Sequence, residues 1–154
     1  MNIHFATMTG NAEALADQGA RQLTAAGIAA ESKNLSKSTA ADLAAEELAL
    51  YVVSTWGDGD APDDAMDLWT ALEAADAPSM QGLRYAVFGL GDSSYPEFNA
   101  FARKLDERLG ALGGRRLEDR FEADLDYQDD FEAWINRMQK ILHVLKQSQL
   151  AAQV

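Results

Sequence analysis

The chain has 154 residues, no cysteine and a formal net charge of −12 at pH 7. This length suits one domain, and the lack of cysteine excludes disulfides, thiolate metal sites and cysteine nucleophiles. The acidic balance excludes nucleic-acid binding through clustered Lys and Arg. No apolar run approaches the roughly 20 residues of a membrane span, and the N-terminus lacks the features of a signal peptide, so we expect a cytoplasmic protein.

Strand-like and helix-like segments alternate along the chain. The first half predicts a strand over 1–6, a helix over 11–26, a weak strand over 28–34, a helical turn at 39–44 and a strand over 48–55. The second half predicts a helix over 64–76, a strand over 83–89, a helix over 98–112, a polar strand over 115–121 and a helix over 128–147. We expect Asn11 to cap the first helix and Gly27 to end it. We expect Leu15, Gly19 and Leu23 to form the apolar face of this helix, and Met66, Trp69 and Leu72 that of the helix over 64–76.

Five strands that alternate with helices predict an α/β fold, in which a doubly wound parallel sheet lies between two layers of helices. We expect a single domain over 1–147 and a frayed tail over 148–154. Ligands of such folds bind outside the carboxyl ends of the strands. The candidate loops are therefore 7–12, 55–62 and 90–99, which follow the first, third and fourth strands.

The first loop, TMTGNA, joins a strand to the N-terminus of a helix. Hydroxyl groups from Thr7 and Thr9, the amide of Asn11 and free backbone N–H groups converge there, and the helix dipole favours an anion. The pattern is neither GxxxxGK[ST] nor GxGxxG, and the loop contains no Lys or Arg. It predicts a phosphate held by hydrogen bonds, with an ordinary helix cap as the alternative.

The second and third loops each carry an aromatic residue. In STWGDGDAPDDA, Trp56 follows a buried strand, and in LGDSSYPEFNAF, Tyr95 follows the next one. A turn followed by a hydrophobic contact would explain the third loop alone. Two aromatic walls beside a candidate phosphate site instead favour a flat heteroaromatic monophosphate as the ligand.

The charge is unevenly distributed, because the stretch from Ser38 to Leu83 holds ten acidic residues and no Lys or Arg. This stretch forms either a solvated, solubilising surface or a steering surface for a basic partner protein.

Four stretches carry a resemblance to a known family: TMTGNAE, STWGDGDAPDDA, VFGLGDSSYPEFNAF and RRLEDRFEADLDYQDDFEAW. In this order the chain resembles the flavodoxins. Within them it is most similar to the FMN domain of sulfite reductase flavoprotein and other diflavin reductases, and to the short-chain, MioC-type flavodoxins. The resemblance implies a flavodoxin-like fold and noncovalently bound FMN. We expect no metal site, because the chain has only two histidines, His4 and His143, far apart in the sequence.

The resemblance also implies the residues that contact FMN. The phosphate would be surrounded by Thr7, Met8, Thr9, Gly10, Asn11 and Ala12. One flavin face would be covered by Thr55, Trp56, Gly57, Asp58 and Gly59, with Trp56 stacked on the ring. The opposite face would be covered by Leu90, Gly91, Asp92, Tyr95, Phe98 and Asn99, with Tyr95 stacked. Asp124 would lie near the flavin.

The function implied is that of a one-electron carrier and not of an enzyme. We expect an NADPH-dependent flavoprotein reductase as the donor and a heme, iron–sulfur or other redox protein as the acceptor, each docking through a basic face. One alternative is an FMN-dependent quinone or azo reductase. Another is a receiver-type signalling domain, although the acidic pair that it needs after the first strand is replaced by Thr7-Met8-Thr9.

Overall fold

The computed structural model describes residues 1–7, 9–55 and 59–152. The strands are β1 (Asn2–Ala6), β2 (Glu31–Asn34), β3 (Leu48–Ser54), β4 (Arg84–Leu90), β5 (Arg115–Arg116) and β6 (Phe121–Ala123). The α-helices are α1 (Asn11–Ala25), α2 (Ala40–Ala44), α3 (Met66–Glu73), α4 (Ala100–Ala111) and α5 (Gln128–Ala152). Single 3-10 turns lie at Leu35–Lys37 and Asp63–Ala65.

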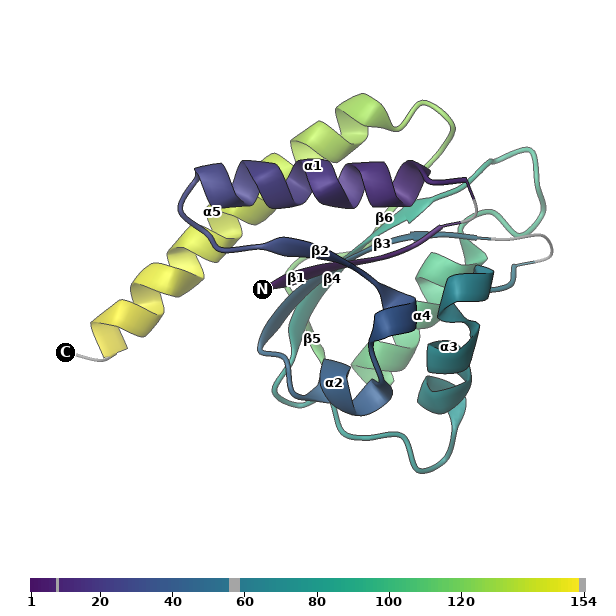
Figure 1. Ribbon diagram of the computed structural model, residues 1–154, viewed down its shortest axis with the longest axis horizontal. Coiled ribbons are helices and arrows are strands. Elements are labelled where there is room, and N and C mark those ends of the chain that lie inside the picture. Colours follow the sequence, from purple (N-terminus) through teal and green to yellow (C-terminus); the bar gives the residue numbers. More distant parts are fainter. Residues whose placement is uncertain (8, 56–58, 153–154) are drawn as a thin grey trace.

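The strands form one parallel sheet in the order β2-β1-β3-β4-β5, and β6 pairs with β4 farther along the same edge. Helices α1 and α5 cover one face of this sheet, and α2, α3 and α4 cover the other (Figure 1). The predicted doubly wound, three-layer α/β fold is therefore confirmed. Among the described residues, no helix is both long enough and apolar enough to cross a membrane.

Each face of the sheet carries its own hydrophobic core, because side chains alternate along a strand. Phe5, Val52 and Phe88 pack with α1 and α5, whereas Val53 and Val87 pack with α3 and α4. The central strand β3 is buried from Ala49 to Val53. This explains why its sequence is continuously apolar instead of alternating between apolar and polar residues.

Helix α1 packs closely against α5 at Gly19. A Cβ atom at this position would lie 3.2 Å from the Cδ1 of Ile135 and 3.3 Å from the ring of Phe131. The predicted inward face of α1, with Leu15, Gly19 and Leu23, is buried as expected. Gly27 follows the helix with a φ of 87°, in the left-handed region that glycine adopts readily, which confirms it as the helix stop.

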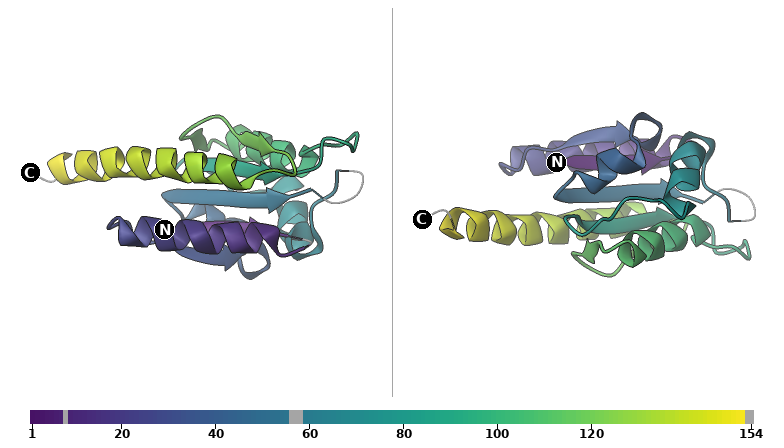
Figure 2. Two further views of the ribbon diagram at one scale, coloured as in Figure 1. Left: turned by 90° about the horizontal axis from the view of Figure 1, so that it is seen from above. Right: turned by 90° about the horizontal axis from the view of Figure 1, so that it is seen from below.

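Four expectations about these elements were wrong. Gly10, with a φ of 89°, caps α1 in place of Asn11, and the cap has no side-chain hydrogen bond. Met66 is 43% exposed, because it begins α3 at the solvent, while Leu68 is buried in its place. Helix α5 continues to Ala152 and does not end at residue 147, and its C-terminal part extends beyond the sheet (Figure 2).

The fourth wrong expectation is the single strand predicted over 115–121. The structure has two short strands here, β5 and β6, separated by residues 117–120, which belong to neither strand. Arg116, at the end of β5, and Arg120, directly before β6, both bind the carboxylate of Asp106 on α4. These ion pairs hold the segment against α4, a long-range effect that local sequence periodicity does not encode.

Candidate functional site

A cavity of about 430 Å³ lies at the carboxyl ends of the strands. Its volume is within the range of about 300–1,000 Å³ that is usual for small-molecule sites. The loops at this end lie opposite the C-terminus of α5 (Figure 1). The cavity is lined by Thr9, Asn11, Ser54, Thr55, Leu90, Gly91, Asp92, Tyr95, Glu97, Phe98, Asn99, Leu125 and Tyr127.

The first loop is shaped by a short hydrogen bond within it. The hydroxyl oxygen of Thr7 accepts a hydrogen bond from the Gly10 N–H at 2.9 Å, which closes the turn before α1. Thr9 and Asn11 line the cavity beside this turn. The first N–H groups of a helix have no partner within the helix, so the start of α1 favours an anion.

Asp64 fixes the beginning of the first loop from outside it. Its Oδ2 accepts a hydrogen bond from the Thr7 N–H at 3.4 Å and another from Asn34 Nδ2 at 3.1 Å. A residue downstream of the second loop thus ties the ends of β1 and β2 together.

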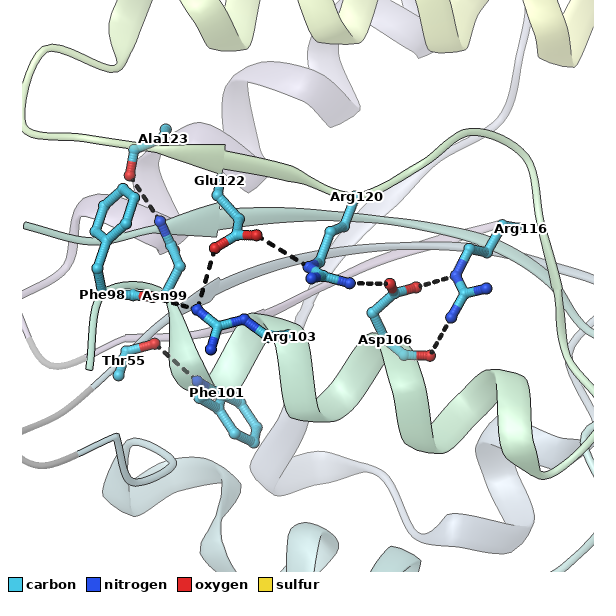
Figure 3. Close-up of polar contacts among 10 residues, drawn as sticks. All are labelled: Thr55, Phe98, Asn99, Phe101, Arg103, Asp106, Arg116, Arg120, Glu122 and Ala123. Atoms are coloured by element: carbon cyan, nitrogen blue, oxygen red, sulfur yellow. Dashed lines mark hydrogen bonds and ion pairs between the residues drawn. The ribbon is translucent and has the colours of Figure 1, made fainter. Parts of the chain in front are cut away.

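The second loop is attached to α4 at Thr55 and at Gly59. Thr55 Oγ1 accepts a hydrogen bond from the Phe101 N–H at 3.0 Å, which satisfies a free donor in the first turn of the helix (Figure 3). Gly59 has a φ of 100°, and a Cβ atom there would lie 3.0 Å from that of Ala100. Lys104 donates a hydrogen bond to the Gly59 carbonyl at 3.2 Å.

The third loop begins with a turn organised by Asp92. Its Oδ1 accepts hydrogen bonds from the Ser94 N–H at 2.9 Å and from the Ser94 hydroxyl at 2.6 Å. Its carbonyl accepts a further hydrogen bond from the Tyr95 N–H at 3.1 Å. This turn presents the Tyr95 side chain at the cavity, where the residue is 61% exposed. Tyr95 is thus an aromatic surface without a packing role in the core.

Asn99 holds the floor of the cavity together. It is fully buried and has a φ of 55°, a conformation that asparagine tolerates better than most residues. Its Nδ2 donates a hydrogen bond to the Ala123 carbonyl at 2.9 Å, and the Gly91 N–H donates to the same oxygen at 3.1 Å. The ends of β4 and β6 and the start of α4 are therefore joined at this point.

Asp124 holds the third loop against the end of β6. Its Oδ1 accepts hydrogen bonds from the Ser93 N–H at 3.1 Å and from the Leu125 N–H at 2.8 Å. These bonds, those from Ser93 first, lower the pKa of the Asp124 carboxyl below its ordinary value, because they stabilise the charged form. Asp124 positions a loop of the cavity, although it is not one of the lining residues.

The structure brings together predicted residues from all three loops. Those that line the cavity are Thr9, Asn11, Thr55, Leu90, Gly91, Asp92, Tyr95, Phe98 and Asn99. Those that are described but do not line it are Thr7, Gly10, Ala12, Gly59 and Asp124. Ala12 is buried in the core beneath α1. Met8, Trp56, Gly57 and Asp58 lie outside the described residues, so the roles expected for them stay predictions.

Sequence reasoning missed four lining residues: Ser54, Glu97, Leu125 and Tyr127. Leu125 and Tyr127 follow β6, so the rule that ligands bind at the carboxyl ends of strands applies to them as well. They were missed because the last strand was predicted to end at residue 121, and it ends at Ala123.

The lining residues favour a flat, partly polar ligand. Tyr95, Phe98, Leu125 and Tyr127 provide aromatic and apolar surface, while Thr9 and Asn11 provide hydrogen-bonding groups at one end. Of the lining residues that the structure describes, none is Lys, Arg or His. A ring system with a phosphate at the first loop fits this set, with hydrogen bonds and the helix N-terminus holding the anion.

Comparison with known proteins gives the same family at three levels. A model of the flavodoxin family matches residues 3–134. The sulfite reductase (NADPH) flavoprotein alpha-component of Neisseria meningitidis serogroup C is 40% identical over 137 residues, which are 89% of this chain and 23% of that protein. The chain thus spans just under a quarter of the length of this curated relative.

Two solved structures share the fold over nearly their whole length. A flavodoxin variant from Pseudomonas aeruginosa has a TM-score of 0.79 and 30% identity, and the match covers 92% of this chain and 97% of that one. A short-chain flavodoxin associated with a PDU bacterial microcompartment has a TM-score of 0.79 and 25% identity, and covers 94% and 96%.

Proposed function

The chain belongs to the flavodoxin family, and from this premise we propose that it binds FMN noncovalently and carries single electrons between redox proteins. One observation supports the proposal above the others. The loops that follow β1, β3 and β4 meet around one cavity of about 430 Å³, with an exposed aromatic residue, Tyr95, at its wall. When bound, the flavin supplies the redox chemistry.

The residues of the cavity have distinct tasks in this proposal. The turn from Thr7 to Gly10 and the start of α1 hold the phosphate by hydrogen bonds, and Tyr95 covers one face of the ring. Asp92 and Glu97 contribute negative charge to the lining. Because carboxylates disfavour added negative charge nearby, this lining favours a low reduction potential for the final electron.

Titration of the apoprotein with FMN and with riboflavin tests the proposal. We expect FMN to bind at least about tenfold more tightly than riboflavin, because only FMN carries the phosphate that the first loop receives. Visible spectra during stepwise anaerobic reduction are expected to show two separate one-electron steps. If neither flavin binds, the proposal is wrong. Equal affinities for FMN and riboflavin would show that the first loop does not bind the phosphate.

The electron donor and acceptor are proposed to be separate proteins with basic docking faces, the donor being an NADPH-dependent flavoprotein reductase. The acidic stretch between Ser38 and Leu83 includes the second loop and the segment that follows it. Several of its carboxylates are exposed: Asp60, Asp63, Asp67, Glu73 and Asp76. Of these residues, Asp60 and Asp63 lie in or directly after the second loop, whose Thr55 lines the cavity. Their negative charge steers a basic partner toward the flavin.

This steering predicts that the rate of reduction by such a reductase falls with salt, by about tenfold or more between 0.05 and 0.5 M, because salt screens exposed charges. Stopped-flow absorbance measures the rate. Reduction by a small uncharged reductant is the control and is expected to change little. If salt changes the rate of reduction by the reductase as little as it changes the control, the acidic stretch is a solvated, solubilising surface and not a steering surface.

A further inference from the structure

A network of ion pairs extends from the middle of α4 toward the cavity. It begins at Asp106, whose side chain is only 3% exposed. The Asp106 carboxylate accepts hydrogen bonds from Arg116 Nε at 2.7 Å and from Arg120 Nη1 at 3.0 Å (Figure 3). A buried carboxylate is stabilised when cationic donors satisfy both of its oxygens, so Asp106 fixes the position of both guanidinium groups.

The network continues from Arg120 to a residue of the cavity. Arg120 Nε donates to Glu122 Oε2 at 3.2 Å, and the other oxygen of Glu122 lies 3.4 Å from Arg103 Nη2. The same Nη2 donates a hydrogen bond to the Phe98 carbonyl at 2.8 Å (Figure 3). Phe98 lines the cavity, so a network that starts at a buried carboxylate ends at the cavity wall.

The position of Arg103 gives this last contact a specific effect. Phe98 lies two residues before Ala100, the first residue of α4. Here the chain turns from the exposed third loop into the helix. From Ser93 to Glu97 every residue of that loop is exposed, so few packing contacts fix its conformation. The hydrogen bond from the charged Arg103 side chain to the Phe98 carbonyl, at 2.8 Å, therefore restrains the end of this loop strongly.

We propose that Arg103 is a positioning residue that holds the Phe98 side of the cavity in the conformation that binds the flavin. This inference rests on the proposed function, because it concerns affinity for the same ligand. The ion pair with Glu122 contributes little by itself, because the two side chains are 40% and 28% exposed. The essential contact is the hydrogen bond to the Phe98 carbonyl.

The test compares Arg103→Met, which keeps an unbranched side chain but removes every donor, with Arg137→Met. Arg137 is a matched control, because it is 42% exposed and pairs with Glu118, which is 28% exposed and not a lining residue. We expect Arg103→Met to bind FMN about tenfold more weakly, the order of one lost charge-assisted hydrogen bond, and Arg137→Met to match the wild type within about twofold.

Two further readouts separate positioning from general structural support. The visible absorption and circular dichroism of the bound flavin are expected to shift in Arg103→Met alone, and Arg103→Lys, which keeps one charged donor, is expected to restore them in part. Amide hydrogen exchange of the apoprotein is expected to quicken between residues 93 and 98 in Arg103→Met and not in Arg137→Met.

The outcomes distinguish the inference from the function on which it rests. A wild-type protein that binds no flavin would overturn the proposed function, whereas the exchange measurement on the apoprotein would still test Arg103. If Arg103→Met and Arg137→Met agree in FMN affinity, flavin spectra and loop exchange, Arg103 has no positioning role. If Arg103→Met does not fold, Arg103→Lys replaces it in the test. We then expect Arg103→Lys to lose FMN affinity by less than about tenfold, and wild-type affinity in this variant would overturn the inference.

Discussion

Replacing Tyr95 by alanine is expected to weaken FMN binding by about 10- to 100-fold, since stacking on an aromatic side chain contributes about 1–3 kcal/mol. The free energy of unfolding of the apoprotein is expected to stay within about 0.5 kcal/mol, because Tyr95 is 61% exposed and outside both cores. Quenching of flavin fluorescence measures the first quantity and urea denaturation the second.

Tyr95→Phe is the control, because it keeps the ring and removes only the hydroxyl group. It is expected to retain FMN affinity within about threefold, as stacking depends on the ring. An alanine variant with wild-type affinity would show that Tyr95 does not cover the flavin. A phenylalanine variant as weak as the alanine variant would show that the hydroxyl group, and not the ring, makes the contact.

Gly89→Ala is expected to destabilise the fold by about 1–3 kcal/mol, near the upper end of this range, because the site is overpacked. The new Cβ atom would lie 2.5 Å from Asn99 Oδ1 and 2.6 Å from the Cβ of Ala102. Neither neighbour has room to move, because Asn99 is bonded to the Ala123 carbonyl and Ala102 is fully buried. Urea denaturation of the apoprotein measures the loss.

The matched control is Gly82→Ala, where an added Cβ would meet no atom within 4 Å. Its stability is expected to stay within about 0.5 kcal/mol of the wild type. Because Asn99 lines the cavity, Gly89→Ala is also expected to weaken FMN binding, which the Gly82 variant does not. Equal stability of the two variants would mean that Asn99 can leave its position without cost.

The position of the candidate site could be predicted from the sequence. Helical and strand periodicity placed the strands, and the carboxyl ends of parallel strands lie at one edge of a sheet. Thr9, Thr55 and Tyr95, each from a different loop, therefore meet around one cavity. Their contact with FMN rests on the family and stays a prediction.

The contacts that fix the loops could not be predicted in this way. Asn99 binds the Ala123 carbonyl, and Asp124 binds the Ser93 N–H, across 24 and 31 residues of sequence. Thr55 caps α4 across 46 residues. Such bonds depend on how the ends of separate strands approach each other, and residue spacing along the chain contains no direct signal of that distance.

By itself, the sequence determined the parallel fold, the two buried faces of the sheet and the edge at which the loops gather, because burial of apolar side chains imposes a local period on each element. The tertiary structure alone decided where the last strand breaks, because Arg116 and Arg120 bind Asp106 on a neighbouring helix. The electrostatic attraction between a buried carboxylate and a guanidinium group depends on the distance between them in space, and not on the number of residues between them in the chain.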